Sequence, residues 1–452
     1  MMIADTIAAI STAVGEAALS VIRISGPEAR SIATTVFRSA RGEAGDLTPR
    51  TAHLVRAMDA EGGRMDEGLL LRFVGPASYT GEDLIEFHGH GGLLVTRQVL
   101  ERVLGAGARA ADPGEFTQRA FLNGKMDLTQ AEAVMDLIHA QSHLALRAAN
   151  EQLAGAIGEE AMALREELVP TLAHVEAYID FPDEGISPDT GAAMMARLDA
   201  IMARARKLLA TSEQGRILRQ GARTVIFGAP NVGKSSLLNR LVGFERAIVS
   251  GTAGTTRDTI EEGLQVHGIP LCLIDTAGVR EDADVLEQEG IKRTRREIER
   301  ADLVIEVADG SQSTEARQRV DVDAESGAAR ILIRNKADLP AHPSWEGVKS
   351  MPVSCVTGDG LSELRDEIRD RIFAAGGLAS DHPVAINARH KACFERLLKH
   401  LTAGREALER GESPEFIALD LREALQALGE VVGQVDVEQV LDVIFSSFCI
   451  GK

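Results

Sequence analysis

The sequence predicts a multidomain protein that combines an N-terminal α+β domain, an all-α helical bundle and an α/β domain of the P-loop type inserted into the bundle. Strand-like and helical segments alternate near the N-terminus, whereas helical periodicity runs on alone after residue 128. Alternation returns after residue 220 together with a glycine-rich phosphate-binding motif. The expected boundaries are 1–120 for the α+β domain, 121–219 and 378–452 for the two parts of the bundle, and 220–377 for the inserted domain.

The composition limits the classes of function. The 452 residues are 44% hydrophobic and 26% charged, which is typical of a soluble chain with several cores. The formal net charge of −19 is unlike that of a protein that grips nucleic acid over a broad surface, so any RNA contact is expected to be local or shared with a partner. No basic N-terminal leader and no apolar run long enough for a bilayer is present, so we expect a cytoplasmic protein without a membrane partner.

The N-terminal region is expected to contain a sheet with two covering helices. Alternating or β-rich segments predict strands over Leu19–Ile24, His53–Met58, Gly68–Phe73 and Leu84–His88. Helices are expected over 28–37 and from the glycine cluster at 89–92 through residue 104. That cluster is either a close approach of the backbone to a ligand or a plain strand–turn–helix connection, and spacing alone favours the second interpretation.

The helical segments occupy two separate stretches of the chain. Helical periodicity runs from Leu128 to Arg219 and again from Ala388 to Phe448. The simplest interpretation is one helical domain interrupted by the inserted domain, and two separate helical domains remain the alternative.

The inserted domain is organised around residues 228–235, which fit G-x-x-x-x-G-K-[ST]. A short apolar strand, 223–227, precedes the motif and a helical pattern follows it, so backbone N–H groups and the helix N-terminus can face an anion. Lys234 is expected to reach the β and γ phosphates, and the Ser235 hydroxyl to hold Mg²⁺. The alternative, a glycine turn between strand and helix, is weakened by the motifs that follow.

Two further motifs each follow an apolar strand. Asp275-Thr-Ala-Gly278 is expected to help position Mg²⁺ and to sense the γ-phosphate. In Asn335-Lys-Ala-Asp338, the Asp338 carboxylate can accept the N1–H and the amine of guanine, which adenine does not offer, while the Lys336 stem covers the ring. Ser354–Val356 would complete the base pocket. The order of these motifs predicts a guanine-nucleotide site in a Ras-like P-loop GTPase domain.

The stretch Gly254-Thr-Thr-Arg-Asp258 stands where such domains place a threonine that completes Mg²⁺ coordination, and Thr256 is the candidate. The residues expected to contact GTP are Asn231, Val232, Gly233, Lys234, Ser235, Ser236, Ser250, Gly251, Thr252, Ala253, Gly254, Thr255, Thr256, Asp275, Thr276, Ala277, Gly278, Asn335, Lys336, Ala337, Asp338, Ser354, Cys355 and Val356.

The usual water-orienting glutamine is missing, because Val279 occupies its position. Arg257 and Arg280 are candidates for an arginine finger by position only. Several carboxylates lie within 280–289, and the default interpretation of each is a solvated acidic loop residue.

Motifs across the whole chain resemble the MnmE (TrmE) family of tRNA-modification GTPases. Besides the GTPase motifs, those that carry the resemblance are Asp5-Thr-Ile7, Val21-Ile-Arg-Ile-Ser-Gly26, Thr80-Gly-Glu-Asp83, Gly89-His-Gly-Gly92, Pro113-Gly-Glu-Phe116, Arg119-Ala-Phe-Leu-Asn123, Asp180-Phe-Pro-Asp-Glu184 and Phe445-Ser-Ser-Phe-Cys-Ile-Gly-Lys452. The resemblance implies a homodimer that works with the FAD-dependent partner MnmG (GidA), in a heterotetramer-type complex, on C5 of the wobble uridine of certain tRNAs. The group added would be aminomethyl or carboxymethylaminomethyl.

The resemblance also implies cofactors and site residues. The N-terminal domain would bind 5-formyltetrahydrofolate or a related folate and dimerise, with Arg23, Glu86, Lys125 and Lys452 contacting the folate. K⁺ would replace the arginine finger when two GTPase domains meet, and its matching positions are Asn231, Ser250, Thr252 and Thr255. Glu287 would orient water. Cys449 is either a thiol close to the folate and substrate or a small buried residue of a docked tail.

Two other functions remain open at this point. One is a pure switch GTPase that binds ribosome or RNA without folate chemistry. The other is a folate-dependent one-carbon enzyme that the GTPase domain merely regulates.

Overall fold

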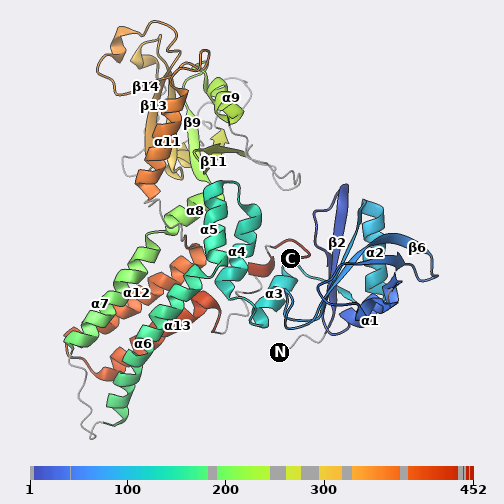
Figure 1. Ribbon diagram of the computed structural model, residues 1–452. Helices are drawn as coiled ribbons and strands as arrows, with labels where there is room; N and C mark the ends of the chain where they lie inside the picture. Colours follow the sequence, from blue (N-terminus) through green and yellow to red (C-terminus); the bar gives the residue numbers. More distant parts are fainter. Residues whose placement is uncertain are drawn as a thin grey trace. The chain divides into compact units, whose positions relative to one another are not determined.

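The structure is a computed structural model, and it describes residues 5–40, 42–181, 191–244, 261–275, 295–317, 328–376, 385–435, 441, 444–446 and 448–452. The chain forms two compact units. Met1–Met135 and Gly429–Lys452 make up the first, here called the terminal unit. Asp136–Leu428 make up the second, here called the central unit. Figure 1 shows the helices and strands of both units, coloured by their position in the sequence.

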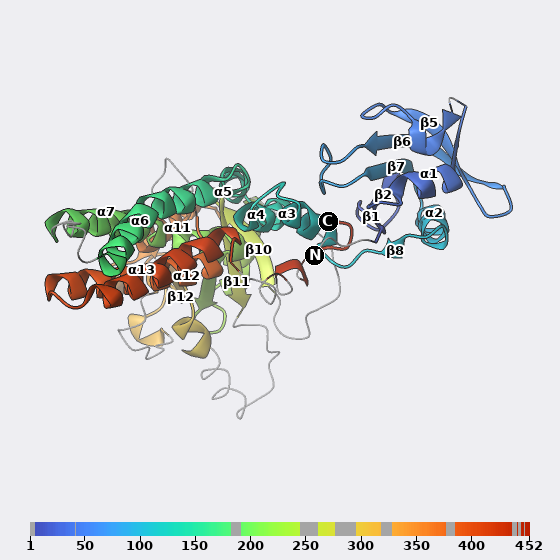
Figure 2. The ribbon, with the colours of Figure 1, turned by 90° about the horizontal axis from the view of Figure 1, so that it is seen from below.

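The terminal unit is built on an eight-stranded sheet with the order β4-β3-β5-β6-β7-β2-β1-β8. Figure 2 shows β5, β6, β7, β2, β1 and β8 of this sheet. Its neighbouring strands are antiparallel except for β1 and β8. The strands are β1 (Ile7–Ile10), β2 (Ala17–Ser25), β3 (Phe37–Ser39), β4 (Gly42–Glu43), β5 (His53–Met58), β6 (Arg64–Phe73), β7 (Leu84–Gly91) and β8 (Arg109–Ala110). The four strands expected in this region are therefore confirmed, with β6 longer than expected.

Two helices, α1 (Ala29–Val36) and α2 (Leu93–Gly105), cover one face of this sheet. Because side chains alternate along a strand, Ile22 and Phe87 point into the core that these helices close. The intervening residues lie on the other face, where Leu54 on β5 is paired with Leu69 on β6. These two leucines are 63% and 43% exposed, so the second face keeps an apolar surface.

Helix α3 (Glu115–Leu122) joins separate parts of the terminal unit through Arg119, which is 1% exposed. The Arg119 guanidinium donates to the Asp5 carboxylate at 2.7 Å, to Glu115 at 2.8 Å and to Glu82 at 3.2 Å. Burial alone would raise the pKa of the Glu115 carboxyl, but hydrogen bonds from Arg109, from an amide and from Arg119 hold it below its usual value. The N-terminal strand and the loop 75–83 are thus tied to α3.

The C-terminal residues also lie against α3, as the position of the C-terminus in Figure 1 shows. Ile450 forms a β-bridge with Pro113, and the Phe116 amide donates to the Lys452 carbonyl at 3.2 Å. Gly451 has φ of 94°, and a Cβ there would lie 2.2 Å from the Ile10 carbonyl oxygen. Only glycine fits this approach of the tail to β1.

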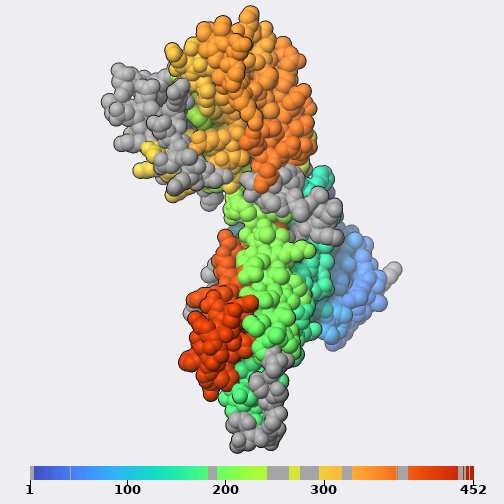
Figure 3. All heavy atoms as spheres, turned by 90° about the vertical axis from the view of Figure 1, so that its left-hand side faces the viewer, coloured from blue at the N-terminus to red at the C-terminus, as the bar shows by residue number. Residues whose placement is uncertain are grey.

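The bundle helices are α4 (Leu128–His139), α5 (His143–Leu153), α6 (Ala156–Asp180), α7 (Ala192–Leu209), α8 (Ser212–Gln220), α12 (Ala388–Glu409) and α13 (Pro414–Val432). α7 and α12 pack side by side in the central unit (Figures 1 and 3). The Arg405 guanidinium donates to Asp199 at 2.8 Å across this contact. Helices were expected in both segments, and their presence is confirmed.

The central unit also contains a six-stranded sheet with the order β10-β11-β9-β12-β13-β14. Only β10 is antiparallel to its neighbour. The strands are β9 (Ala222–Phe227), β10 (Glu261–Val266), β11 (Ile269–Asp275), β12 (Leu303–Asp309), β13 (Ala329–Asn335) and β14 (Met351–Pro352). The carboxyl ends of the parallel strands therefore lie along one edge of the sheet.

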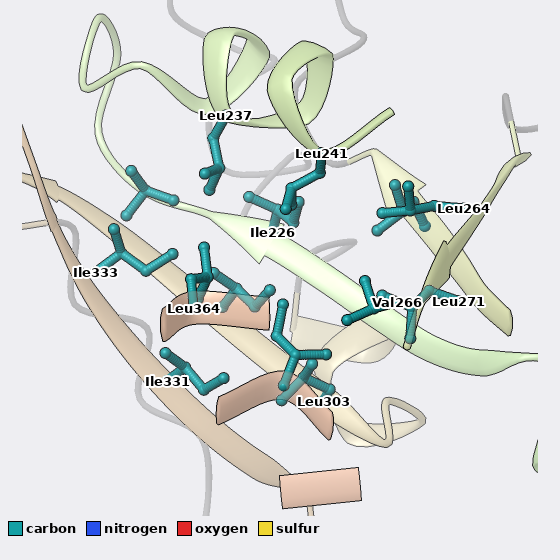
Figure 4. Packing of buried hydrophobic residues seen from close by; sticks show 14 of the residues in the cluster. Ile226, Leu237, Leu241, Leu264, Val266, Leu271, Leu303, Ile331, Ile333 and Leu364 are labelled. Carbon is teal, nitrogen blue, oxygen red and sulfur yellow. The ribbon is translucent and has the colours of Figure 1, made fainter. Parts of the chain in front are cut away.

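Two helices close one face of the six-stranded sheet: α9 (Lys234–Phe244) and α11 (Leu361–Gly376). Figure 4 shows Leu237 of α9 directed at Ile226 of β9, with Leu364 of α11 in the same buried cluster. This packing fixes α9, and hence the loop before it, against β9. The strand–loop–helix arrangement expected around the P-loop is confirmed.

The end of β7 also differs from expectation, at the glycine cluster 89–92. The strand expected to end at His88 continues to Gly91 and pairs with β2 up to Ala17. A Cβ at Gly89 would lie 2.5 Å from the Asp66 carboxylate, and one at Gly91 2.4 Å from the Ala17 carbonyl oxygen. These glycines permit close packing inside the sheet.

The buried Arg119 network generates a stability prediction. In Arg119→Met, three carboxylates lose a buried cation, so the free energy of unfolding should fall by about 3 kcal/mol. Calorimetric unfolding of the full chain measures the change. Arg97→Met is the control, because the Arg97–Glu101 pair is exposed and its loss should change the free energy of unfolding by less than about 0.5 kcal/mol. Equal effects of the two variants would contradict the prediction.

The same comparison should depend on pH. Burial raises and Arg109 and Arg119 lower the pKa of Asp5, with a net decrease, and the pKa of Glu115 is also lowered. Carboxyls with a depressed folded-state pKa contribute stability above their unfolded values, and lose it as the pH falls through the folded-state pKa. The difference in the free energy of unfolding between wild type and Arg119→Met should therefore be largest near neutral pH and should become smaller below about pH 4.

Candidate functional site

The loop after β9 has a backbone that only its glycines permit. Gly228 has φ of 156°, and a Cβ on it would lie 2.1 Å from the Val307 carbonyl oxygen. Gly233 has φ of 100°, and its Cβ would lie 2.2 Å from the Asn335 side-chain nitrogen. Asn231 is also left-handed, with φ of 60°. The chain turns sharply and enters α9 at Lys234, so backbone N–H groups gather at the helix N-terminus.

One ammonium group and two hydroxyl groups lie at this loop. The Lys234 ammonium donates to the carbonyl oxygens of Gly228 and Ala229, both at 2.8 Å, so it lies over the loop that it belongs to. Ser235 and Ser236 are exposed in the first turn of α9. Backbone N–H groups, an ammonium and hydroxyls are the groups that bind phosphate and its Mg²⁺.

Asn335 joins the phosphate side of the site to the base side. Its side chain is buried, its Nδ2 donates to the Val232 carbonyl at 2.7 Å, and its Oδ1 accepts from the Cys355 amide at 3.3 Å. The P-loop, the end of β13 and the loop after β14 are therefore held by one amide side chain.

The expected base-pocket residues lie together around this amide. Asp338 Oδ1 accepts from Ser354 Oγ at 2.6 Å, and the Ala337 amide donates to the Val353 carbonyl at 3.1 Å. The carboxylate and the 354–356 loop are thus in direct contact. Burial raises the pKa of the Cys355 thiol, which keeps it protonated at neutral pH.

Two side chains that no motif indicated also contact this pocket. Arg240 on α9 donates to the Cys355 carbonyl at 2.9 Å and to the Val356 carbonyl at 2.8 Å. Asp309 at the end of β12 accepts from the Lys336 ammonium at 2.6 Å. Their sequence positions carry no periodic or motif signal, because each reaches the site through the pairing of strands and helices distant in sequence.

The structure describes Asp275 but not several of the other expected nucleotide residues. Asp275 ends β11 and pairs with Ile226 of β9, so its backbone lies at the same sheet edge as the P-loop. The residues Ser250, Gly251, Thr252, Ala253, Gly254, Thr255, Thr256, Thr276, Ala277, Gly278 and Glu287 lie outside the described residues, as do Val279, Arg257 and Arg280.

A second candidate site lies on the terminal unit, around Arg23. Arg23 on β2 and Glu86 on β7 are cross-strand partners, and the guanidinium donates to the carboxylate at 2.8 Å. The guanidinium carbon of Arg23 also lies 5.2 Å from the centre of the Tyr79 ring and 5.6 Å from that of Phe116. Charge and aromatic faces meet here, which suits a flat polar ring as ligand.

The other residues expected at this second site are arranged around it. The Lys125 ammonium donates to the Pro76 carbonyl at 2.9 Å, at the start of the loop that carries Tyr79. The Lys452 carbonyl accepts from the Phe116 amide. Cys449 is exposed, and its carbonyl accepts from the Gly114 amide at 3.5 Å. The structure thus brings Arg23 and Glu86 into contact and ties the tail to the helix that carries Phe116.

Tyr79 and Phe116 were not among the expected site residues. Tyr79 is held by a hydrogen bond of 2.9 Å between its hydroxyl and that of Thr117 on α3. A signal existed in the sequence, because Tyr79 is one of only two tyrosines and directly precedes Thr80-Gly-Glu-Asp83. His88 also lies here, with its Nε2 3.3 Å from Glu86.

Comparisons with known proteins cover the whole chain. A family model described as the MnmE helical domain matches residues 128–449, and one described as the GTP-binding protein TrmE N-terminus matches residues 6–125. The chain is 53% identical to the tRNA modification GTPase MnmE of Akkermansia muciniphila over 448 residues, which is 99% of each chain. It is 45% identical to the protein of the same name from Geobacter sulfurreducens over 458 residues, covering 100% of both.

The base pocket generates a specificity prediction. In Asp338→Asn, an amide N–H replaces a carboxylate oxygen, so the site should turn from guanine towards xanthine, which carries a carbonyl in place of the amine. The ratio of GTP to XTP affinity should fall by about 10²-fold or more, because buried polar groups penalise a mismatched partner.

Competition of GTP and XTP for the full chain measures this ratio. Asp359→Asn is the matched control, since Asp359 lies in the neighbouring loop after β14 and its carboxylate accepts from Thr357 Oγ1 at 2.7 Å. Selectivity that Asp338→Asn leaves unchanged would disprove the base-pocket assignment.

Proposed function

Because the chain belongs to the MnmE family of tRNA modification GTPases, we propose that it is a K⁺-stimulated, GTP-hydrolysing subunit of a tRNA-modification complex. With FAD-dependent MnmG and a folate one-carbon donor, it adds an aminomethyl or carboxymethylaminomethyl group at C5 of wobble uridine in certain tRNAs. The proposal that the chain binds GTP rests on the buried Asn335 amide, which hydrogen-bonds to both the P-loop and the base-pocket loop.

In this proposal the nucleotide site hydrolyses GTP, and its residues would hold two metal ions. Ser235 and Thr256 would hold Mg²⁺, which would supply charge that neutralises the phosphates. Asn231, Ser250, Thr252 and Thr255 would hold K⁺, which would supply the positive charge that an arginine finger brings elsewhere. Glu287 orients the attacking water. The exposed Asn231 and the open Ser235 hydroxyl support the proposal from the described part of the site.

The site around Arg23 is proposed to bind 5-formyltetrahydrofolate or a related folate. A pterin ring has a guanine-like edge of N–H donors that the Glu86 carboxylate can accept, and a flat face that suits Tyr79 or Phe116. Lys125 and Lys452 supply cations for the negatively charged end of the folate. Cys449 is exposed on the tail that docks beside this site, which favours a thiol with access to substrate.

We also propose that the chain forms a homodimer and acts in the cytoplasm. The exposed Leu54 and Leu69, on the face of the terminal sheet opposite α1 and α2, support an interface with a second copy. Among the described residues, no helix combines the length and the apolar character needed to cross a membrane. The division into domains 1–120, 121–219, 220–377 and 378–452, and the heterotetramer-type complex with MnmG, belong to the same proposal.

The metal proposal predicts a cation effect on turnover. GTP hydrolysis by the full chain should be much faster in K⁺ than in Na⁺, because the smaller ion does not match the same oxygen cage. Glu287→Ala should retain GTP binding but lose about 10²-fold or more of turnover. Glu299→Ala, which removes an exposed carboxylate paired with Arg295, is the control and should behave as wild type. Equal rates in both salts, or near-normal turnover of Glu287→Ala, would refute the proposed machinery.

The folate proposal predicts a binding defect. Arg23→Met should weaken 5-formyltetrahydrofolate binding about tenfold or more, because the variant leaves Glu86 without its cation and Tyr79 without its cationic neighbour. Titration calorimetry on the full chain measures the affinity. Arg56→Met removes an exposed arginine that pairs with Glu67 on the same sheet and should bind folate normally. Absence of folate binding by the wild-type chain would favour a pure switch GTPase instead.

A further inference from the structure

Asp309 is a buried carboxylate at the nucleotide site that no motif indicated. It is the last residue of β12 and lies opposite Asn335 in the parallel pairing of β12 with β13. Its side chain is 3% exposed. Burial and the like charge of an anionic ligand both disfavour an ionised carboxylate at this position. Specific partners must therefore stabilise the charge of Asp309.

The hydrogen bonds of Asp309 fix its direction. Oδ1 accepts from the Ser311 amide at 2.9 Å and from the Ser311 hydroxyl at 2.6 Å, and Gln312 donates to Oδ2 at 3.3 Å. Oδ2 also accepts from the Lys336 ammonium at 2.6 Å. Burial alone would raise the pKa of Asp309, but the bonds from Lys336 and Ser311 lower it, so the carboxylate is ionised at neutral pH. A tight turn therefore holds a charged acceptor in place for one lysine.

Lys336 needs such an anchor. Its backbone has φ of 62°, and its side chain is 35% exposed, next to Asn335 and Asp338 in sequence. A free lysine stem samples many rotamers, and ordering it on a ligand costs free energy. With the ammonium held by Asp309, the stem is ordered before the ligand arrives.

We propose that Asp309 is a positioning residue of the guanine-nucleotide site, which orders Lys336 so that its stem covers the base. The inference rests on the proposed GTP function. It adds a second role for the ion pair: Asp309 lines a small hollow with Ala229 and Val232 of the P-loop, so its charge lies near the phosphate-binding loop. Lys336 neutralises that charge, and an unpaired Asp309 would repel the phosphates.

The double-mutant cycle of Asp309→Asn and Lys336→Met separates this role from a merely structural one. Asparagine keeps the shape and the bonds from Ser311 but loses the charge, and methionine keeps an apolar stem but loses the ammonium. The probe is a fluorescent GDP bound by the full chain and displaced by GDP, GTP or ADP. Glu306→Gln is the matched control, because Glu306 lies on the same strand and binds Arg317 of the same loop at 2.8 Å without contacting Lys336.

Asp309→Asn should weaken GDP and GTP binding equally, about tenfold, and leave kcat at saturating GTP unchanged. Lys336→Met should weaken binding more, because it leaves a buried carboxylate unpaired. In the Lys336→Met background, Asp309→Asn should restore affinity rather than reduce it. Glu306→Gln should change the affinity less than twofold.

Other outcomes overturn the inference. An equal loss from Asp309→Asn with and without the Lys336 ammonium would mean that Asp309 acts only through its own loop. Unchanged or tighter binding of Asp309→Asn alone would also refute the positioning role. If the wild-type chain fails to bind the probe, or ADP displaces it as well as GDP, the guanine-site proposal itself fails and this inference falls with it.

Discussion

The buried side chain of Asn335 links the parts of the nucleotide site. Its amide donates to the P-loop at Val232 and accepts from the Cys355 amide, so it joins loops that follow three different strands. A single amide can do this because the parallel strands of the sheet all end at one edge. The glycine at position 233 is part of the same constraint, since a Cβ there would meet the Asn335 side chain at 2.2 Å. The phosphate-binding loop and the base-binding loops are thereby held in a fixed arrangement.

The terminal unit depends on a comparable interaction, with charge in place of an amide. Arg119 of α3 binds Asp5 before β1 and Glu82 of the loop that carries Tyr79. The same helix receives the C-terminal tail through the Phe116 amide. Arg23 and Glu86 sit on strands of the sheet, whereas the aromatic rings beside Arg23 come from the loop and from α3. The shape of this second site is therefore a consequence of how α3 is anchored.

Both units show the same rule for buried charge. Arg119 and Asp309 are almost completely buried, and each is surrounded by partners of opposite charge or by hydrogen-bond donors. Burying an unpaired charge costs several kcal/mol, so such groups are retained only where the partners are in place. Arg119 ties the loop 75–83 to α3, and Asp309 binds the Lys336 ammonium, which we propose orders the Lys336 stem. This ordering is what a binding site requires before its ligand arrives.

The sequence by itself determined the fold class, several of the strands and helices, and the nucleotide motifs. Alternation and glycine spacing are local signals, so β2, β5, β7, β9 and α9 were predictable, as was the order of the three GTPase motifs. The tertiary structure decided what depends on distant segments meeting: the extension of β7 to Gly91, the pairing of Asp309 with Lys336, the Arg240 contacts, and the rings of Tyr79 and Phe116 beside Arg23. These contacts are set by strand pairing and helix packing between residues far apart in the chain, and periodicity or a short motif carries no information about such partners.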